Sequence, residues 1–190
     1  MTEGIEMHWM ALVFSIVCAT VPAAGEGHIP QTNDPELKAA FLLNFAKFTV
    51  WPPEMLPPDS PLIACVLGGG RVAEALEDLT RGQQVQGREV IVRRIDADGP
   101  IRTCHLLYGT ALEGPRAAAV VGKVASAPVL TVSDSADFAS RGGIANFYVD
   151  AGRMRFAVNP EAATRAGLRL SSRLLNLARL VKEDHDGGGR

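Results

Sequence analysis

The sequence has few of the residues from which metal sites and catalytic centres are built. It contains three cysteines and four histidines, and neither C-x-x-C nor H-x-x-x-H spacing occurs. Acidic residues do not cluster on one face of any expected element, and no G-x-S-x-G turn is present. Zinc, calcium and serine-hydrolase sites depend on such patterns. We therefore expect no metal, no cofactor and no enzymatic activity.

The sequence also lacks a strong imbalance of charge. Charged residues make up 21% of the chain, and the formal net charge is -2. A broad positive surface that could hold phosphate backbones is therefore not available, and no nucleic-acid partner is expected. Hydrophobic residues make up 47% of the 190 residues. This is enough for one sizeable core, so a single domain is expected.

No apolar run in the sequence is long enough to cross a bilayer as a stable helix. The run from Trp9 to Val21 is too short, and the small residues of VPAAG follow it. This layout is typical of a cleavable secretory signal, which we place at residues 1–25. Its leading segment carries Glu3 and Glu6 but no basic residue, so Met7 is an alternative start. A buried N-terminal helix of a cytosolic protein is the other interpretation.

A first helix is expected directly after Asp34-Pro35, a capping carboxylate followed by a proline suited to the first turn. It should run to Thr49 and end before Trp51, which two prolines follow. Its apolar residues cover the whole circumference, because Lys38 and Lys47 project to opposite sides. Such a helix must be buried, so one side needs a partner or a second copy of the chain. Alternatively, other helices of the same domain cover it.

The rest of the chain alternates short apolar runs with helical patterns. This order predicts an α/β fold: a single domain with a mostly parallel sheet, flanked by helices, and an added antiparallel hairpin. We expect strands at 61–68, 88–96, 103–109 and 128–132, a hairpin of 144–149 with 153–158, and helices at 71–82, 116–124, 133–143, 160–166 and 172–182. In the last helix, Leu174, Leu177, Ala178 and Val181 should share one face. The domain should span residues 35–182, between a flexible leader (26–34) and a disordered tail (183–190).

A glycine-rich turn is the strongest hint of ligand binding. Gly68, Gly70 and Ala73 fit G-x-G-x-x-A between an expected strand and helix, as in dinucleotide-binding folds. The acid that should bind a ribose about 20 residues further on is missing, and Asp96 is the nearest strand-end substitute. A tight structural turn is the simpler explanation. A phosphate or carboxylate held by Gly68, Gly69 and Gly70 without catalysis is a further possibility.

Two cysteines remain once Cys18 is assigned to the signal. In an oxidising compartment Cys65 and Cys104 could form one disulfide, or they could stay as two buried thiols. His105 follows Cys104 directly in an expected strand. Their side chains therefore point to opposite faces and cannot act together as nucleophile and base.

Several segments resemble, in order, the blocks of the YfiR family. They are ELKAAFLLNFAKFTVWPP, PLIACVLG, REVIVRRI with TCHLLYG, VLTVSDSADFASRGGIANF and RMRFAVNPEAATRAGLRLSSRLLNLARLV, which together span residues 35–182. The resemblance implies an exported periplasmic regulator that binds the periplasmic part of an inner-membrane diguanylate cyclase, YfiN-like, or another membrane sensor. Less cyclic di-GMP and less biofilm would follow. Cys65 and Cys104 fall where some members carry a linked pair, whereas a second pair of those members is missing from residues 139–152.

The first helix and the corner after it are the expected partner-binding region. Phe41, Asn44, Phe45 and Trp51 fall on the opening block of the resemblance and could anchor a cyclase or a second copy of the chain. Aromatic anchors supply much of the binding energy of an interface. The alternative function is a periplasmic small-ligand or nucleotide-binding protein that uses the turn at Gly68 to Gly70.

Overall fold

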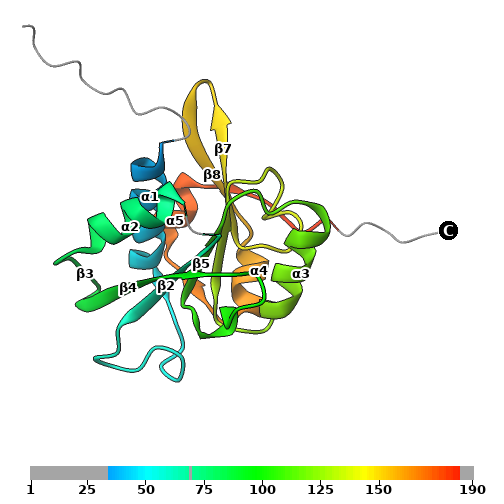
Figure 1. Ribbon diagram of the computed structural model, residues 1–190. Coiled ribbons are helices and arrows are strands. Elements are labelled where there is room, and N and C mark those ends of the chain that lie inside the picture. The colour runs from blue at the N-terminus through cyan, green and yellow to red at the C-terminus, as the bar shows by residue number, and fades with distance from the viewer. Residues whose placement is uncertain (1–33, 69, 185–190) are drawn as a thin grey trace, which may run out of the picture.

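The computed structural model describes residues 34–68 and 70–184. The expected signal peptide, the expected leader up to residue 33, Gly69 and residues 185–190 lie outside the described residues. Within them, strands and helices alternate along most of the chain and form one α/β domain (Figure 1).

An eight-stranded sheet lies at the centre of the domain. Its strands are β2 (Leu62–Leu67), β3 (Gln84–Val85), β4 (Arg88–Ile95), β5 (Leu106–Gly109), β6 (Leu130–Ser133), β7 (Ala145–Asp150), β8 (Arg153–Val158) and β10 (Arg179–Leu180). Their order is β10-β8-β7-β6-β5-β2-β4-β3. The strands from β4 to β7 in this order are parallel, and β7 and β8 form the antiparallel hairpin. The predicted mostly parallel sheet with an added hairpin is confirmed.

Helices cover both faces of this sheet. They are α1 (Pro35–Lys47), α2 (Arg71–Thr80), α3 (Gly114–Val124), α4 (Pro160–Arg165) and α5 (Ser172–Leu177), with a short 3₁₀ helix η1 (Ile101–Thr103). One core contains Phe45 of α1 and Leu76 of α2, and the other contains Val120 of α3. Val66 faces the first core and its neighbour Cys65 the second, as the two-residue period of a strand requires. The buried run of β2 thus separates two layers of helices.

The first helix forms where its capping residues predict. Asp34 accepts a hydrogen bond from the amide of Glu36 at 3.0 Å, and Pro35 occupies the first turn. The helix ends at Lys47, two residues earlier than expected. A second, two-stranded sheet follows, in which β1 (Thr49–Val50) pairs antiparallel with β9 (Arg169–Leu170).

Ser133 ends β6 and residues 134–142 form bends and turns, so the helix predicted at 133–143 was wrong. The Asp134 carboxylate does not cap a helix, because it accepts hydrogen bonds from Lys38 Nζ at 2.8 Å and Tyr108 Oη at 3.0 Å. Asp137 has a φ of 62°, which a right-handed helix does not contain. Contacts with distant parts of the chain have replaced the local capping pattern.

The predicted final helix was also too long. α5 ends at Leu177, whose side chain is 75% exposed, while Leu174 is buried. The chain then becomes extended and pairs with β8, and the Arg179 guanidinium lies 4.2 Å from the centre of the Tyr148 ring. Val181 donates its amide to Val158 O at 2.9 Å. Pairing with a sheet edge has therefore outweighed the helical pattern of the last apolar residues.

Packing continues past residue 182, where the tail was expected to begin. Asp184 donates its amide to Ser140 O at 2.7 Å, and Glu183 forms an ion pair with Arg165. Among residues 34–68 and 70–184, no helix has both the length and the apolar character that a membrane span needs.

Candidate functional site

The aromatic residues of α1 meet the hairpin of β7 and β8. Phe45 is 1% exposed and stacks on Phe147, with ring centres 5.7 Å apart, and it meets the edge of Phe156 at 4.9 Å. Phe41 lies 5.8 Å from Phe147 and 5.9 Å from Phe156 and stays partly exposed. The same domain therefore covers much of the side of α1 for which the sequence suggested a partner.

One side of α1 still faces outward, and we call it the outer strip of α1. Asn44 is exposed at its centre, and the residues around it are partly buried. The strip consists of Leu37, Ala40, Phe41, Asn44 and Phe48. The structure thus separates the predicted partner residues: Asn44 is exposed and Phe41 is partly exposed, whereas Phe45 and Trp51 are buried.

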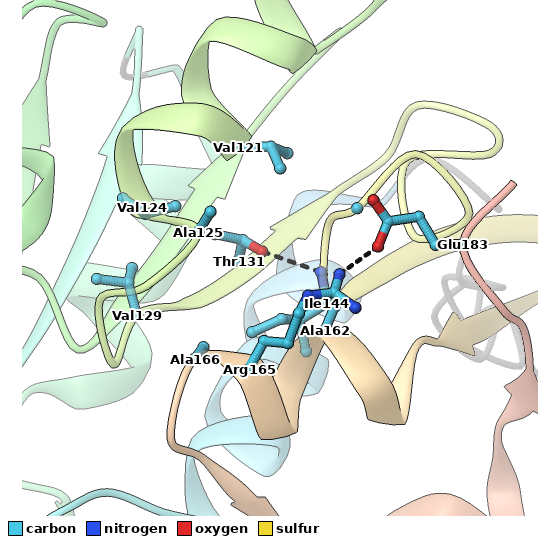
Figure 2. Close-up of a pocket in the computed structure, with 11 residues that line it drawn as sticks. Val121, Val124, Ala125, Val129, Thr131, Ile144, Ala162, Arg165, Ala166 and Glu183 are labelled. Atoms are coloured by element: carbon cyan, nitrogen blue, oxygen red, sulfur yellow. Dashed lines mark hydrogen bonds and ion pairs between the residues drawn. The ribbon is translucent and has the colours of Figure 1, made fainter. Parts of the chain in front are cut away.

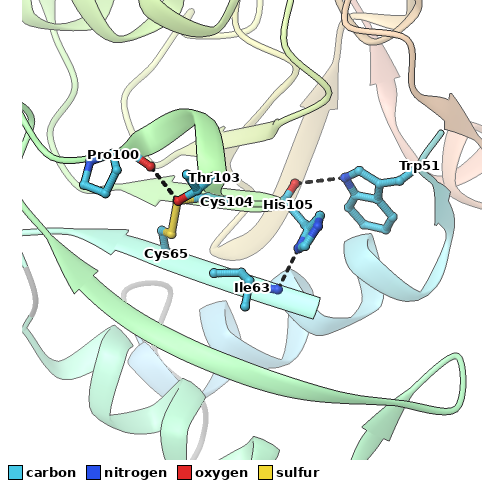
Figure 3. The surroundings of a disulfide bond; sticks show 7 residues. All are labelled: Trp51, Ile63, Cys65, Pro100, Thr103, Cys104 and His105. Carbon is cyan, nitrogen blue, oxygen red and sulfur yellow. Dashed lines mark hydrogen bonds between the residues drawn. A yellow bond between two sulfur atoms is a disulfide. The ribbon is translucent and has the colours of Figure 1, made fainter. Parts of the chain in front are cut away.

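Trp51 and His105 contact each other inside the domain (Figure 3). Trp51 is 5% exposed, and its indole N–H donates to His105 O at 3.1 Å. The Ile63 amide donates to Nδ1 of His105 at 2.8 Å, so this ring nitrogen carries no proton. Nε2 lies 3.0 Å from Met55 O and is therefore the protonated nitrogen. Burial lowers the pKa of His105, and the charges of Arg88 and Arg93 act in the same direction, while the hydrogen bond to Met55 opposes them. The neutral ring is therefore favoured.

The structure joins Cys65 and Cys104 in a disulfide, as the family resemblance implied (Figure 3). Their Cα atoms are 5.9 Å apart, and both residues are fully buried. The bond ties β2 to the residue that precedes His105 and β5. His105 contacts Trp51 on the other side of the sheet, so Cys104 and His105 point to opposite faces, as predicted.

An open cleft lies beside the glycine turn, at the carboxyl ends of β2, β5 and β6. Its volume is about 530 Å³. Gly68 and Gly70 have φ values of 76° and 84°, which favour glycine, and Gly70 is the N-cap of α2. The cleft is lined by Pro35, Lys38, Leu67, Gly68, Gly70, Arg71, Val72, Thr110, Arg116 and Asp134. Asp96, the substitute for a ribose-binding acid, is not among them.

A partly buried ion pair lies in this cleft. Lys38, 5% exposed, donates to Asp134 Oδ2 at 2.8 Å, and the Ala111 amide donates to Asp134 Oδ1 at 2.9 Å. Burial alone would raise the pKa of Asp134. The hydrogen bonds from Lys38, Ala111 and Tyr108, with the charge of Lys38, outweigh burial and lower this pKa. Burial raises the pKa of Tyr108, which keeps its hydroxyl protonated.

A second, smaller cavity lies between α3 and α4 (Figure 2). Its volume is about 120 Å³, and most of its lining is aliphatic. Arg165 and Glu183 form an ion pair at one side, and Thr131 Oγ1 accepts a hydrogen bond from the Ile144 amide at 3.0 Å. Its polar groups are therefore already engaged with one another or with the backbone.

Sequence reasoning missed the charged residues of the larger cleft. The pattern of the sequence predicted Lys38 on the surface of a helix and Asp134 at a helix cap, and it indicated no role for Arg71 or Arg116. A signal was available, because Gly68, Thr110 and Asp134 each directly follow a parallel strand, and the carboxyl ends of such strands meet at one edge. In the part of the chain that the structure describes, no group of three or more His, Cys, Asp or Glu residues could hold a metal ion.

Comparison with known proteins assigns the chain to a family. The pattern of the YfiR/HmsC-like family matches residues 35–179, which is most of the chain. The chain belongs to the YfiR/HmsC-like family. This membership indicates a periplasmic protein.

A solved structure shows the same fold at low sequence identity. It is a conserved domain protein from Vibrio cholerae O1 biovar El Tor strain N16961, with a TM-score of 0.50 and 14% identity. The similarity covers 78% of this chain and 60% of that protein. The chain therefore spans about 60% of the length of that relative. At this identity the likeness concerns the fold alone.

Proposed function

We propose that this protein is a periplasmic, non-catalytic regulator that binds the periplasmic part of an inner-membrane diguanylate cyclase and holds it inactive. Less cyclic di-GMP and less biofilm follow from this restraint. The match of the YfiR/HmsC-like family across residues 35–179 is the observation that carries the proposal.

The outer strip of α1 is the surface that best suits such a partner. It places Asn44 among the partly exposed apolar side chains of Leu37, Phe41 and Phe48. A polar group surrounded by aromatic and aliphatic side chains is a suitable centre for a desolvated interface. Phe45 and Trp51 are buried in the domain, so we do not include them among the contact residues.

α5 begins beside the outer strip of α1, and two exposed leucines lie at and beyond its far end. The Ser171 amide donates to Phe48 O at 2.9 Å, so α5 begins beside the end of α1. Further along, Leu177 and Leu180 are 75% and 57% exposed. Large apolar side chains that are this exposed on a small domain typically mark a protein contact when they gather near one another.

Photo-cross-linking in cells tests this proposal even when the partner has not been identified beforehand. A photoreactive phenylalanine analogue placed at Asn44 should form an adduct with an inner-membrane protein that carries a cytoplasmic diguanylate cyclase domain, as identified by mass spectrometry. The matched control places the same analogue at Ser126, which is exposed and follows α3 on the opposite side of the sheet. This position should give no such adduct.

Two outcomes would contradict the proposal. One is an adduct from position 44 that contains only a second copy of the chain, which would make the strip a dimer interface. The other is equal labelling of the cyclase from positions 44 and 126. Because the Asn44 side chain is exposed, the substitution should not disturb the fold, and circular dichroism checks this directly.

A further inference from the structure

The cleft beside the glycine turn lies at a switch point of the sheet. β2 and β5 are adjacent and parallel. The helix after β2, α2, packs on one face, and the helix after β5, α3, packs on the other. Where successive helices leave neighbouring strands in opposite directions, a crevice opens beyond the carboxyl ends of those strands, and open α/β sheets bind ligands there.

Positive charge dominates this crevice. The charges of Lys38 and Asp134 offset each other in their ion pair. Arg71 and Arg116 also line the cleft, and neither forms an ion pair with any other residue that the structure describes. These two guanidinium groups belong to the first turns of α2 and α3, on opposite sides of the sheet. The cleft is therefore lined by two guanidinium groups, one from each side of the sheet, that form no ion pair within the described residues.

The backbone beside Arg71 is also suited to an anion. Gly70 begins α2 without any side chain that accepts from the first amides of the helix. An added Cβ at Gly68 or at Gly70 would meet no atom within 4 Å, so these glycines do not fill a packed corner. Their positive φ values instead turn the backbone from β2 into α2, and helix amides without a cap are favourable anion partners.

The volume fits a small molecule better than a bare ion. About 530 Å³ lies within the range of pockets that hold small organic ligands. Thr110 adds a hydroxyl to the lining. The Asp134 carboxylate already accepts three hydrogen bonds. Its ion pair with Lys38 therefore forms a fixed part of the cleft lining, and the carboxylate is not available to a ligand.

We propose that this cleft binds a small organic molecule through an oxyanion, a phosphate or a carboxylate, held by Arg71 and Arg116 and the first amides of α2. This site is separate from the outer strip of α1 and does not depend on the proposed partner. The regulator thereby has a place to sense a soluble anionic metabolite.

Calorimetric titration of the purified mature protein at low ionic strength tests the site. The probes are pyrophosphate and citrate, which supply the two oxyanion chemistries separately. We expect saturable one-to-one binding of at least one probe. Arg71→Gln and Arg116→Gln should each weaken it about tenfold or more, the usual effect of losing a charge-assisted hydrogen bond. The probe that binds more tightly shows whether phosphate or carboxylate is the preferred group.

A matched control separates this site from a general effect of charge. Arg169→Gln removes the same charge from an exposed residue beside Val50, past the opposite end of α1. α1 is about 20 Å long, so this variant should bind the probe as the wild type does. No saturable binding of either probe up to about 10 mM would overturn the proposal. Equal affinity in the wild type and both cleft variants would overturn it too, provided that thermal unfolding shows that all variants are folded.

Discussion

Reducing the Cys65–Cys104 disulfide should lower the free energy of unfolding by about 4 kcal/mol while leaving the fold intact. The two cysteines are 39 residues apart in the sequence. A cross-link that closes a loop of this length restricts the unfolded chain, and the chain-entropy estimate for it is about 4 kcal/mol at 25 °C. The folded chain needs no rearrangement when the bond opens, because sheet pairing already holds β2 beside β5.

Reduction is a cleaner perturbation than substitution here. Both sulfur atoms lie in a fully buried core, so Cys65→Ala with Cys104→Ala would add the cost of lost packing to that of the lost cross-link. The protein should therefore be unfolded and refolded in urea, once with and once without a thiol reductant. For a urea slope of about 2 kcal/mol/M, the midpoint should fall by about 2 M on reduction.

Two results would refute this reasoning. Equal urea midpoints with and without reductant would show that the bond does not restrict the unfolded chain. Two thiols that react with an alkylating agent in denatured, periplasmic material would show that Cys65 and Cys104 are not linked in the cell.

Three further predictions test the interior of the domain. NMR titration should place the pKa of His105 below 6.5, because burial disfavours the charged ring. The free energy of unfolding should fall as the pH drops below about 6.5, because the unfolded chain binds the proton before the folded chain does. The His105→Gln variant should lose this pH dependence. Asp134→Asn should cost about 3 kcal/mol at pH 7 in urea unfolding, because it breaks the largely buried ion pair between Lys38 and Asp134. Because the pKa of Asp134 is lowered in the folded chain, the ion pair stabilises the fold fully above about pH 4, and this stabilisation is lost as the pH falls through the pKa of the folded state. The difference in unfolding free energy between the wild type and Asp134→Asn should therefore shrink in acid. A difference that stays constant with pH would contradict this prediction. Gly143→Ala should cost about 2 kcal/mol in thermal unfolding, because its Cβ would overlap the Phe138 ring. Gly122→Ala, with open space around it inside α3, should instead stabilise the domain slightly.

The sequence predicted the elements whose signals are local. Asp34 and Pro35 mark the start of α1, and the continuous apolar run of β2 marks a strand buried on both faces. Ala151 and Gly152 form the turn of the hairpin, where both residues have positive φ values. These signals act over a few residues, so they do not depend on distant parts of the chain.

The errors arose where distant contacts decide the local structure. Asp134 has the chemistry of a helix cap, but Lys38 and Tyr108, from other elements, take its carboxylate. Leu177, Ala178 and Val181 fit one helical face with Leu174, but the edge of β8 offers the chain a strand partner. The periodicity of the sequence shows neither the donors that bind Asp134 nor the strand edge that pairs with the end of the chain.

The candidate sites show the same division. The sequence showed that α1 is rich in apolar residues, but not that Phe147 and Phe156 would cover Phe45 and part of Phe41. The sequence also indicated the glycine turn as a candidate ligand site, but it did not indicate the two arginines that lie beside the turn. Arg71 and Arg116 come together only because α2 and α3 leave adjacent strands.

Restraint of a cyclase by this protein can be measured as the cellular level of cyclic di-GMP, determined by mass spectrometry in a strain that lacks the gene. We expect a higher level in this strain. The wild type and Ser126→Arg should restore it to normal, but Asn44→Arg, which places a charge on the outer strip of α1, should not. An unchanged level on deletion, or full restoration by Asn44→Arg, would contradict the claim that this surface restrains a cyclase.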